Sequence, residues 1–330
     1  MEKIVLASLD RDSSDHDSPD HDPSDHDSPW PHRFAVLTAI MTLPLLFVGG
    51  LVTSLKVGMV VPDWPTTFGY NMFLYPWSKM IGGIFYEHSH RLLGSAVGLL
   101  TILLAVVLWF KESRQWLRWL GLIALGAVIL QGVLGGLRVI LVLHKIAIIH
   151  ACVAQAFFAL VTSLALFTSR EWKSYTQQTP SKATKKTRQL GLWATGLIYA
   201  QLILGAVFRH TGAGLRLHIL GAVVVFISVF LLVDHVQQYH ADQPFLMRSA
   251  LVLRRLLLVQ VGLGFLTYVV KYLAPDGLLT SQAVLFATSH VIIGALMLVT
   301  SVRFALRAYH ILVEPQTPPS QPIFSKQVSV

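Results

Sequence analysis

Four histidines, His90, His150, His218 and His290, each lie just inside the start of every second apolar segment of the chain. Metal-binding side chains are rare inside membrane helices and mark functional sites there. A zinc site would need further ligands at one locus, whereas each of these histidines stands alone on its own segment. Two trans imidazoles are a ligand set for heme iron. The spacing therefore predicts two pairs of axial ligands and up to two hemes held between helices.

A carboxylate accompanies the first of these histidines. Glu87 precedes His90 by three residues, and helical spacing puts both on one face. Glu87 is thus a candidate general base or proton relay. The alternative is an ion pair with Arg91, four residues after Glu87, and spacing alone favours neither. Arginines near the same helix ends are candidates to bind heme propionates, because guanidinium groups match carboxylates, with interface anchoring as the alternative for each: Arg91, Arg138 and Arg209.

Long apolar segments must position these side chains. The 330-residue chain is 54% hydrophobic and 13% charged, with a mean hydropathy of +0.59, whereas soluble domains carry about 25% charged residues. A helix that crosses a bilayer needs roughly 20 apolar residues. We therefore predict an all-α integral membrane protein with eight transmembrane helices, at residues 34–55, 89–110, 117–138, 146–168, 190–209, 215–233, 251–273 and 284–308.

The eight segments repeat a hairpin of two spans. The third, fifth and seventh segments carry Gln-x-x-x-Gly, and the segment after each carries one of the four histidines. The first segment matches less well, although Gly49-Gly50 stands where the third segment has Gly135-Gly136. The repeat predicts two pseudo-repeated four-helix bundles, at residues 34–170 and 190–310, joined by a basic linker at 171–189.

The net charge of +9 is unevenly distributed. Residues 1–30 contain nine acidic and two basic residues, so the rest of the chain carries +16. Those basic residues gather in the linker 171–189 and in the loops on the same side. Membrane topology explains this better than nucleic-acid binding. The positive-inside rule predicts cytoplasmic termini in the inner membrane of a bacterium, with the four histidines in the outer half of the membrane.

Both ends of the chain are predicted to be disordered tails. Residues 1–33 include a low-complexity Asp/His tract, Ser14–Pro29, which has too few apolar residues to build a core; weak metal binding is its alternative. Residues 311–330 form the second tail. Cys152 is the single cysteine, which excludes an intramolecular disulfide, and a small core residue is its simplest interpretation.

Several motifs together resemble the heme A synthase family. The stretch Glu87-His88-Ser89-His90-Arg91 resembles that family's Glu-x-x-His-Arg signature, and Pro62-Asp63-Trp64-Pro65 is similar to its first outer loop. Similar motifs precede two other histidines: Gly135-Gly136-Leu137-Arg138 before His150, and Arg209-His210-Thr211-Gly212 before His218. The resemblance covers residues 34–310.

The resemblance implies an enzyme that oxidises a methyl group of heme O to the formyl group of heme A, for cytochrome c oxidase. It implies that His90 and His150 of the N-terminal half bind the iron of the substrate heme. In the C-terminal half, His218 and His290 would bind a heme B cofactor. Glu87 would be the catalytic carboxylate. Heme O synthase and cytochrome oxidase assembly factors are the implied partners, besides membrane lipid.

The chain departs from the family at its loop cysteines. Val61 and Thr67 stand at positions where some members have cysteine, so this chain has no thiol chemistry there. Two other functions stay open. A diheme b-type electron-transfer cytochrome needs the four histidines but not Glu87, and a non-catalytic heme-carrying assembly protein gains nothing from a fixed second heme. Whether the chain forms a homo-oligomer is open as well.

Overall fold

A computed structural model describes residues 28–175, 179–273 and 281–315. Within them, eight helices are long and apolar enough to cross a membrane, as the hydropathy pattern predicts. Each satisfies its own backbone hydrogen bonds, as the dry core of a bilayer requires. The helices are α1 (Trp30–Ser54), α2 (Gly82–Lys111), α3 (Gln115–Leu141), α4 (His144–Phe167), α6 (Thr184–Thr211), α7 (Leu215–Tyr239), α8 (Pro244–Tyr268) with its π-helical continuation η4 (Val269–Leu273), and α9 (Ser281–Ile311).

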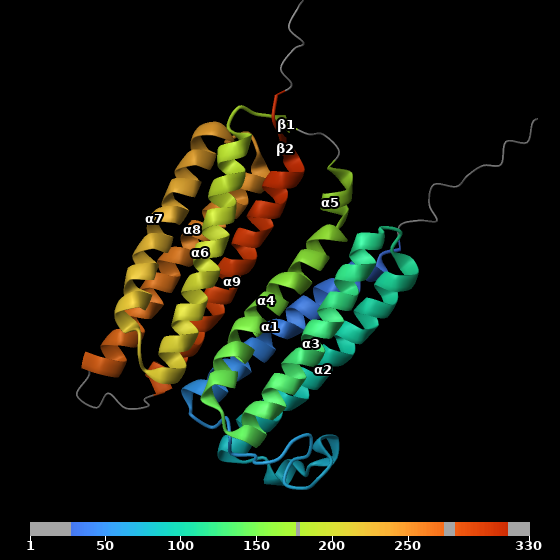
Figure 1. The fold of residues 1–330 in the computed structure, drawn as a ribbon, viewed down its shortest axis with the longest axis vertical. Coiled ribbons are helices and arrows are strands. Elements are labelled where there is room, and N and C mark those ends of the chain that lie inside the picture. Colours follow the sequence, from blue (N-terminus) through green and yellow to red (C-terminus); the bar gives the residue numbers. More distant parts are fainter. Residues whose placement is uncertain (1–27, 176–178, 274–280, 316–330) are drawn as a thin grey trace, which may run out of the picture.

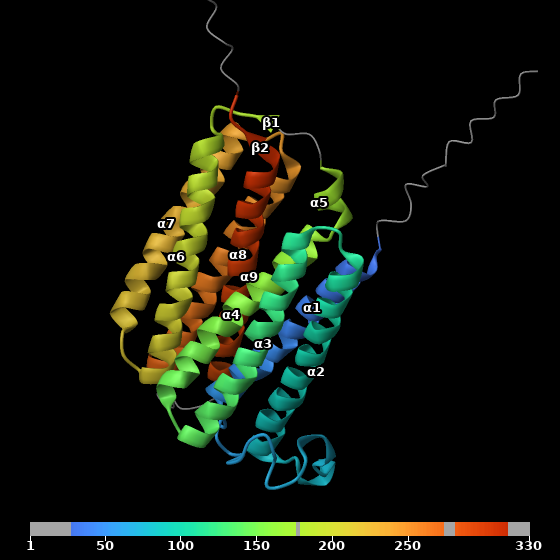
Figure 2. The ribbon, with the colours of Figure 1, turned by 45° about the vertical axis from the view of Figure 1, so that its right-hand side comes forward.

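The helices form two closed rings of four (Figure 1, Figure 2). In the N-terminal half, α1 packs on α2, α2 on α3, α3 on α4, and α4 back on α1; α6, α7, α8 and α9 pack in the same cyclic order. Corresponding helices of the two halves run in the same direction. The chain is therefore an all-α integral membrane protein built from two pseudo-repeated four-helix bundles, as the sequence repeat predicts.

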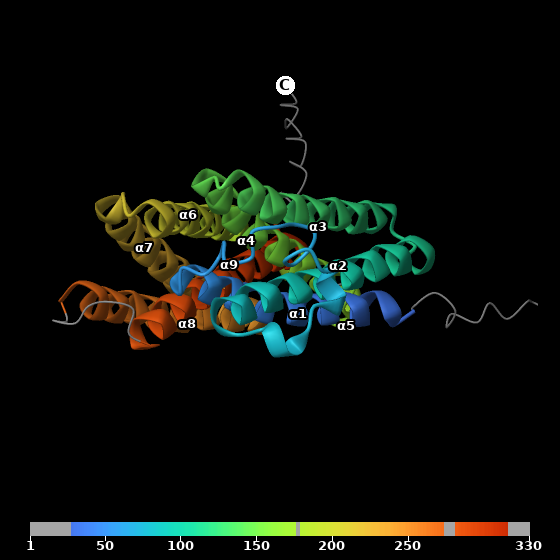
Figure 3. The ribbon, with the colours of Figure 1, turned by 90° about the horizontal axis from the view of Figure 1, so that it is seen from below.

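The two halves meet through α1, α4, α6 and α9, which lie near the centre of the end view (Figure 3). Near the end of α6, the guanidinium of Arg209 donates to the Gly50 carbonyl of α1 at 2.8 Å and to the Ser54 hydroxyl at 2.6 Å. It also donates to the Ala287 carbonyl of α9 at 3.3 Å. Arg209 thus links the halves where the backbone of α1 approaches α9.

The helices extend further than the apolar segments alone predict. The first begins at Trp30 rather than Phe34, so the segment predicted as a tail at 1–33 contains the first turn of α1. The second begins at Gly82, seven residues before the predicted span. Polar side chains at helix ends hide these turns from a hydropathy pattern. Residues 1–27, which include the Asp/His tract, lie outside the described residues.

The basic linker predicted at 171–189 also contains regular structure. It includes most of the short helix α5 (Arg170–Ser174) and the first turns of α6. A two-residue strand, β1 (Thr179–Pro180), pairs in parallel with β2 (Leu312–Val313). The C-terminal segment predicted as a tail from residue 311 therefore starts with the last residue of α9 and the paired strand β2, and residues 316–330 lie outside the described residues.

Arg307 holds α5 against the C-terminal half. This buried side chain of α9 donates to the Ser249 hydroxyl of α8 at 2.8 Å and forms an ion pair with Glu171 of α5 at 2.5 Å. Next to it, the Trp172 ring stacks on the His310 ring with centroids 3.9 Å apart. The ion pair and the stacked rings, together with a hydrogen bond from the Tyr175 hydroxyl to the Gln243 side chain at 3.1 Å, hold the start of the connection against the C-terminal half.

We expect Arg307→Gln to lower the free energy of unfolding by roughly 1–3 kcal/mol, because it removes one partner of a partly buried ion pair. The apparent Tm of the detergent-purified protein measures this. Arg248→Gln is the matched control, since Arg248 is an exposed arginine on α8. Equal Tm values for the two variants would show that the ion pair contributes nothing to stability.

Candidate functional site

The four histidines lie in two facing pairs at one end of the bundle, where α2, α4, α7 and α9 begin, here called the histidine end. His90 and His150 face each other with ring centroids 6.5 Å apart and planes at 81°. His218 and His290 do so at 6.2 Å and 70°. In each four-helix bundle, the two helices that carry the histidines lie diagonally opposite each other. Each half therefore directs two imidazoles toward its own centre.

The spacing of each pair fits one metal ion between two imidazoles. Metal–imidazole bonds are about 2 Å long, so two trans ring centroids should lie about 6 Å apart. Within the described ranges, no three or more His, Cys, Asp or Glu side chains converge in a way that could hold a metal ion, which argues against a zinc cluster there. Two facing imidazoles are the ligands that a bis-histidine heme site requires from the protein.

Each imidazole packs against a glycine of the preceding long helix. A Cβ atom at Gly49 would lie only 2.8 Å from the nearest ring atom, and one at Gly205 or Gly264 would lie 3.1 Å away. A methyl group there would push the ring toward the centre of the bundle. The glycines thus set where each ring sits, and the pairs are Gly49 with His90, Gly135 with His150, Gly205 with His218, and Gly264 with His290.

Three of the four rings also contact a glutamine one turn before that glycine. Nε2 of Gln201 lies 3.0 Å from Nδ1 of His218, and Nε2 of Gln260 lies 3.2 Å from Nε2 of His290. The amide of Gln131, in the orientation that satisfies both its oxygen and its nitrogen, donates to Nδ1 of His150 at 2.9 Å. These glutamines belong to the repeated Gln-x-x-x-Gly motif. The motif was visible in the sequence, but its contact with the histidines was not.

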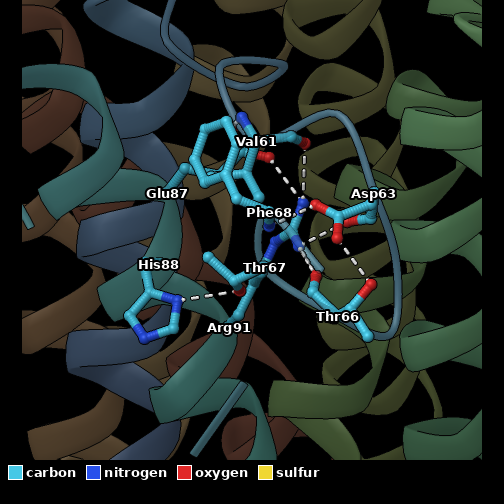
Figure 4. Close-up of polar contacts among 8 residues, drawn as sticks. All are labelled: Val61, Asp63, Thr66, Thr67, Phe68, Glu87, His88 and Arg91. Carbon is cyan, nitrogen blue, oxygen red and sulfur yellow. Dashed lines mark hydrogen bonds and ion pairs between the residues drawn. The ribbon is translucent and has the colours of Figure 1, made fainter. Parts of the chain in front are cut away.

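Glu87 is buried beneath the loop between α1 and α2 (Figure 4). Its Oε1 accepts a hydrogen bond from Arg91 at 3.0 Å, and its Oε2 accepts one from the backbone N–H of Val61, also at 3.0 Å. The ion pair that was the alternative to a catalytic role is therefore formed. Each carboxylate oxygen can accept a second hydrogen bond, so this ion pair does not by itself exclude proton transfer.

Arg91 uses its terminal N–H groups on the same loop (Figure 4). Nη1 donates to the carbonyls of Asp63 at 2.7 Å and Thr66 at 3.0 Å. Nη2 donates to the Val61 carbonyl at 3.0 Å and to Glu87. All four terminal N–H groups are therefore occupied. A propionate could reach Arg91 only by displacing one of these partners, which makes Arg91 the least available of the three predicted arginines.

Asp63 holds the loop from within. Its carboxylate accepts hydrogen bonds from the backbone N–H groups of Phe68 and Gly69, each at 2.8 Å, and from the Thr66 hydroxyl. Burial raises the pKa of the Asp63 carboxyl, but these hydrogen bonds outweigh burial, and the pKa lies below its ordinary value of 3.8. The carboxylate thus stays ionised at neutral pH and keeps the loop closed.

His88 faces the loop rather than the paired imidazoles. Its Nδ1 lies 3.1 Å from the Thr67 hydroxyl, and its ring centroid lies 5.1 Å from that of Tyr75 (Figure 4 shows the first contact). On the other side of the loop, the Trp64 ring fills the space that a Cβ on Gly136 would need. The loop is therefore fastened to both α2 and α3.

Arg138 and Arg209 line one cavity of about 410 Å³ at the histidine end. Lys56 and His210 line it too, and its described lining contains no acidic side chain. Among the described residues, Arg138 has no hydrogen-bond or ion-pair partner, whereas Arg209 is bound to α1 and α9. A cavity with this charge attracts anions.

Comparison with known proteins gives a consistent result. The model of the COX15-CtaA family, described as a cytochrome oxidase assembly protein, matches residues 32–218. The chain is 28% identical over 189 residues to a protein named heme A synthase from Shouchella clausii, and 29% identical over 185 residues to one from Halalkalibacterium halodurans. These matches cover 56% and 55% of this chain.

The chain spans 60% of the length of each of those two relatives. A heme A synthase from Bacillus pumilus is 25% identical over 239 residues, which is 63% of this chain and 76% of that protein. The aligned regions are thus longer than one four-helix half.

We expect Gly264→Ala to weaken heme binding in the C-terminal half severalfold, because the added methyl group would lie 3.1 Å from the His290 ring. Gly262→Ala is the control two residues away on the same helix, where a Cβ meets nothing within 4 Å. Bound heme per chain, measured by the pyridine hemochrome spectrum, checks this. Equal heme content in both variants would mean that the glycine contact does not position the imidazole.

We expect Asp63→Asn to open the loop at neutral pH, since a neutral amide holds the Phe68 and Gly69 N–H groups less tightly. Because the folded-state pKa is lowered, the stabilisation by Asp63 is present above about pH 4 and is lost as the pH falls through the folded value. Hydrogen–deuterium exchange of residues 61–70 should therefore be insensitive to this group between pH 5 and 8. Asp242→Asn, at the other end of the bundle, should leave exchange in the loop unchanged.

Proposed function

Because the chain belongs to the COX15-CtaA family of cytochrome oxidase assembly proteins, we propose that it is a heme A synthase, which oxidises a methyl group of heme O to the formyl group of heme A for cytochrome c oxidase. The observation that carries this proposal is the facing pair of imidazoles in each half. In the N-terminal half, one of these imidazoles follows a buried glutamate by three residues on the same helix. The names of the relatives point the same way.

The proposal gives the two halves different tasks. His90 and His150 would bind the iron of the substrate heme O, and His218 and His290 would bind heme B as a resident cofactor. Only the N-terminal half has an acid three residues before an imidazole. In the C-terminal half, Leu215 and Ala287 stand at the matching positions, and neither can exchange a proton. The half that contains Glu87 is therefore the better candidate for the reaction.

Converting a methyl group to a formyl group removes electrons and protons and adds an oxygen atom. Heme B would supply a redox centre for the electrons when bound. The side chains of this protein contribute binding, orientation and proton transfer. Arg91 and the Val61 N–H fix the two oxygens of Glu87, and the loop above excludes water from them. A carboxylate held in a dry site is suited to accept a proton as charge develops nearby.

The basic cavity supports a site for heme propionates. Guanidinium groups bind carboxylates through paired hydrogen bonds. Arg138 is the strongest of the three predicted candidates, because its guanidinium has no hydrogen-bond partner among the described residues. Arg209 would add positive charge while it holds α1 and α9, and Arg91 is committed to the loop.

The charge bias of the loops supports an orientation in the inner membrane of a bacterium with both termini in the cytoplasm and the histidine end outside. Heme O synthase would deliver the substrate, and cytochrome oxidase assembly factors would receive the product. Both imidazole pairs are complete within one chain, so neither site needs a second copy to supply a ligand.

A diheme b-type electron-transfer cytochrome is the second candidate. The Glu87–Arg91 ion pair is the observation in its favour, since a cytochrome has no need of a reactive carboxylate and a structural ion pair would suffice. A heme-carrying assembly protein is the weaker alternative, because His218 and His290 are both supported by glutamines, as suits a permanently bound group.

Glu87→Gln separates the enzyme from the cytochrome. The detergent-purified wild type, co-expressed with a source of heme O, should carry heme B together with heme A or a partly oxidised intermediate, as identified by chromatography and mass spectrometry. Glu87→Gln should lower the yield of heme A at least about 100-fold, the usual contribution of a general base, while total heme stays the same.

Glu112→Gln is the matched control. Glu112 is a second buried glutamate just past the other end of α2, and it pairs with Arg114 at 2.8 Å; we expect its variant to make heme A normally. A normal heme A yield from Glu87→Gln would remove the catalytic role of Glu87. Heme B alone in the wild type, with heme O unchanged in the membranes, would support the cytochrome.

A further inference from the structure

One of the four imidazoles lacks the glutamine that contacts the other three. The residue one turn before the packing glycine is Leu45 in α1, whereas α3, α6 and α8 carry Gln131, Gln201 and Gln260 there. The Leu45 carbonyl lies near the His90 ring but outside hydrogen-bonding geometry, whereas the Gln260 carbonyl lies 3.1 Å from Nδ1 of His290. Leu45 therefore occupies the equivalent place, but its side chain has no polar group.

The structure shows the consequence for His90. Its Nδ1 is buried and has no partner within hydrogen-bonding geometry. The side-chain amides in the other three sites lie 2.9 Å, 3.0 Å and 3.2 Å from a ring nitrogen. The His90 ring is thus held by packing against Gly49, with no side-chain hydrogen bond to fix its rotation.

The glutamines have the chemistry to support a metal-bound imidazole. Each amide restricts the rotation of its ring. At His218, Nε2 of Gln201 lies 3.0 Å from Nδ1 and donates to the His218 carbonyl at 2.7 Å, which ties the ring to its own backbone. At His290, the Gln260 carbonyl lies 3.1 Å from Nδ1 and can accept the proton that Nδ1 carries when Nε2 binds a metal. Outer partners of this kind orient the ligand, and their loss typically lowers metal affinity about 10–100-fold.

We propose that His90 is an exchangeable heme ligand, and that the leucine at position 45 is what allows the N-terminal half to release its heme. Gln201 and Gln260 keep the heme of the C-terminal half in place. The inference rests on the proposed function and adds a physical reason for its division of tasks. A substrate site must release its product, whereas a cofactor site must not.

The test is the transfer of ferric heme B from the purified full-length protein to excess apomyoglobin, a measurement that involves no turnover. The wild type should release heme in two phases. His150→Ala should remove the fast phase, and His290→Ala should remove the slow one. Leu45→Gln should slow the fast phase about 10–100-fold. Leu45→Met, which keeps an apolar side chain of similar size, should release heme at the wild-type rate.

Two further measurements distinguish the expected effect from misfolding of the Leu45→Gln variant. Gln201→Leu should speed the slow phase by a similar factor, since it removes an outer partner in the other half. Carbon monoxide should bind the ferrous heme of the N-terminal half in the wild type, where His90 can leave the iron, and should bind far less in Leu45→Gln.

The possible outcomes separate the two proposals. An unchanged fast phase in a folded, heme-loaded Leu45→Gln protein overturns the inference about His90 and leaves the proposed function intact. So does a fast phase that disappears in His290→Ala rather than in His150→Ala. A wild type that binds no heme through His90 and His150 overturns the assignment of the substrate site itself.

Discussion

The contact between an imidazole ring and the bare backbone of a glycine, repeated in all four hairpins, sets how closely the helices approach at the histidine end. Lipid gives little hydrophobic drive for helices to associate, so small residues and hydrogen bonds must supply it. The ring of His218 rests on Gly205 and is held by Gln201, and in this position it faces the His290 ring with centroids 6.2 Å apart. The same geometry in the diagonal helix completes the pair.

The sequence predicted the spans, the two halves and the paired imidazoles, because each depends on residue types that recur at regular intervals: apolar residues for the spans, and glycine, glutamine and histidine for the halves and pairs. It did not predict the loop over Glu87, since the groups that hold it are the Val61 N–H and the carbonyls of Asp63 and Thr66. A backbone donor or acceptor leaves no trace in residue identity. The early start of α2 at Gly82 was missed for a related reason, because Glu87 and His88, which contact the loop, interrupt the apolar pattern near the start of the helix.

The loop and the carboxylate form one unit. Arg91 is bonded to Glu87 and to three loop carbonyls at once. The loop therefore cannot leave α2 without breaking the hydrogen bonds that Arg91 and Glu87 make to its backbone. Opening of the loop and exposure of Glu87 to water are thus a single structural event. The Asp63 carboxylate, which closes the far side of the same loop, influences Glu87 without touching it.

The parallel arrangement of two closed rings is also what joining two copies of one four-helix gene would produce. Inverted repeats require that one copy cross the membrane in the opposite sense, whereas here corresponding helices run the same way and a single insertion pattern serves both copies. The ancestor in such a history is a symmetric dimer with two equal pairs of imidazoles. A handful of point changes, among them an acid at position 87 and the loss of an amide at position 45, is then enough to make the copies unequal.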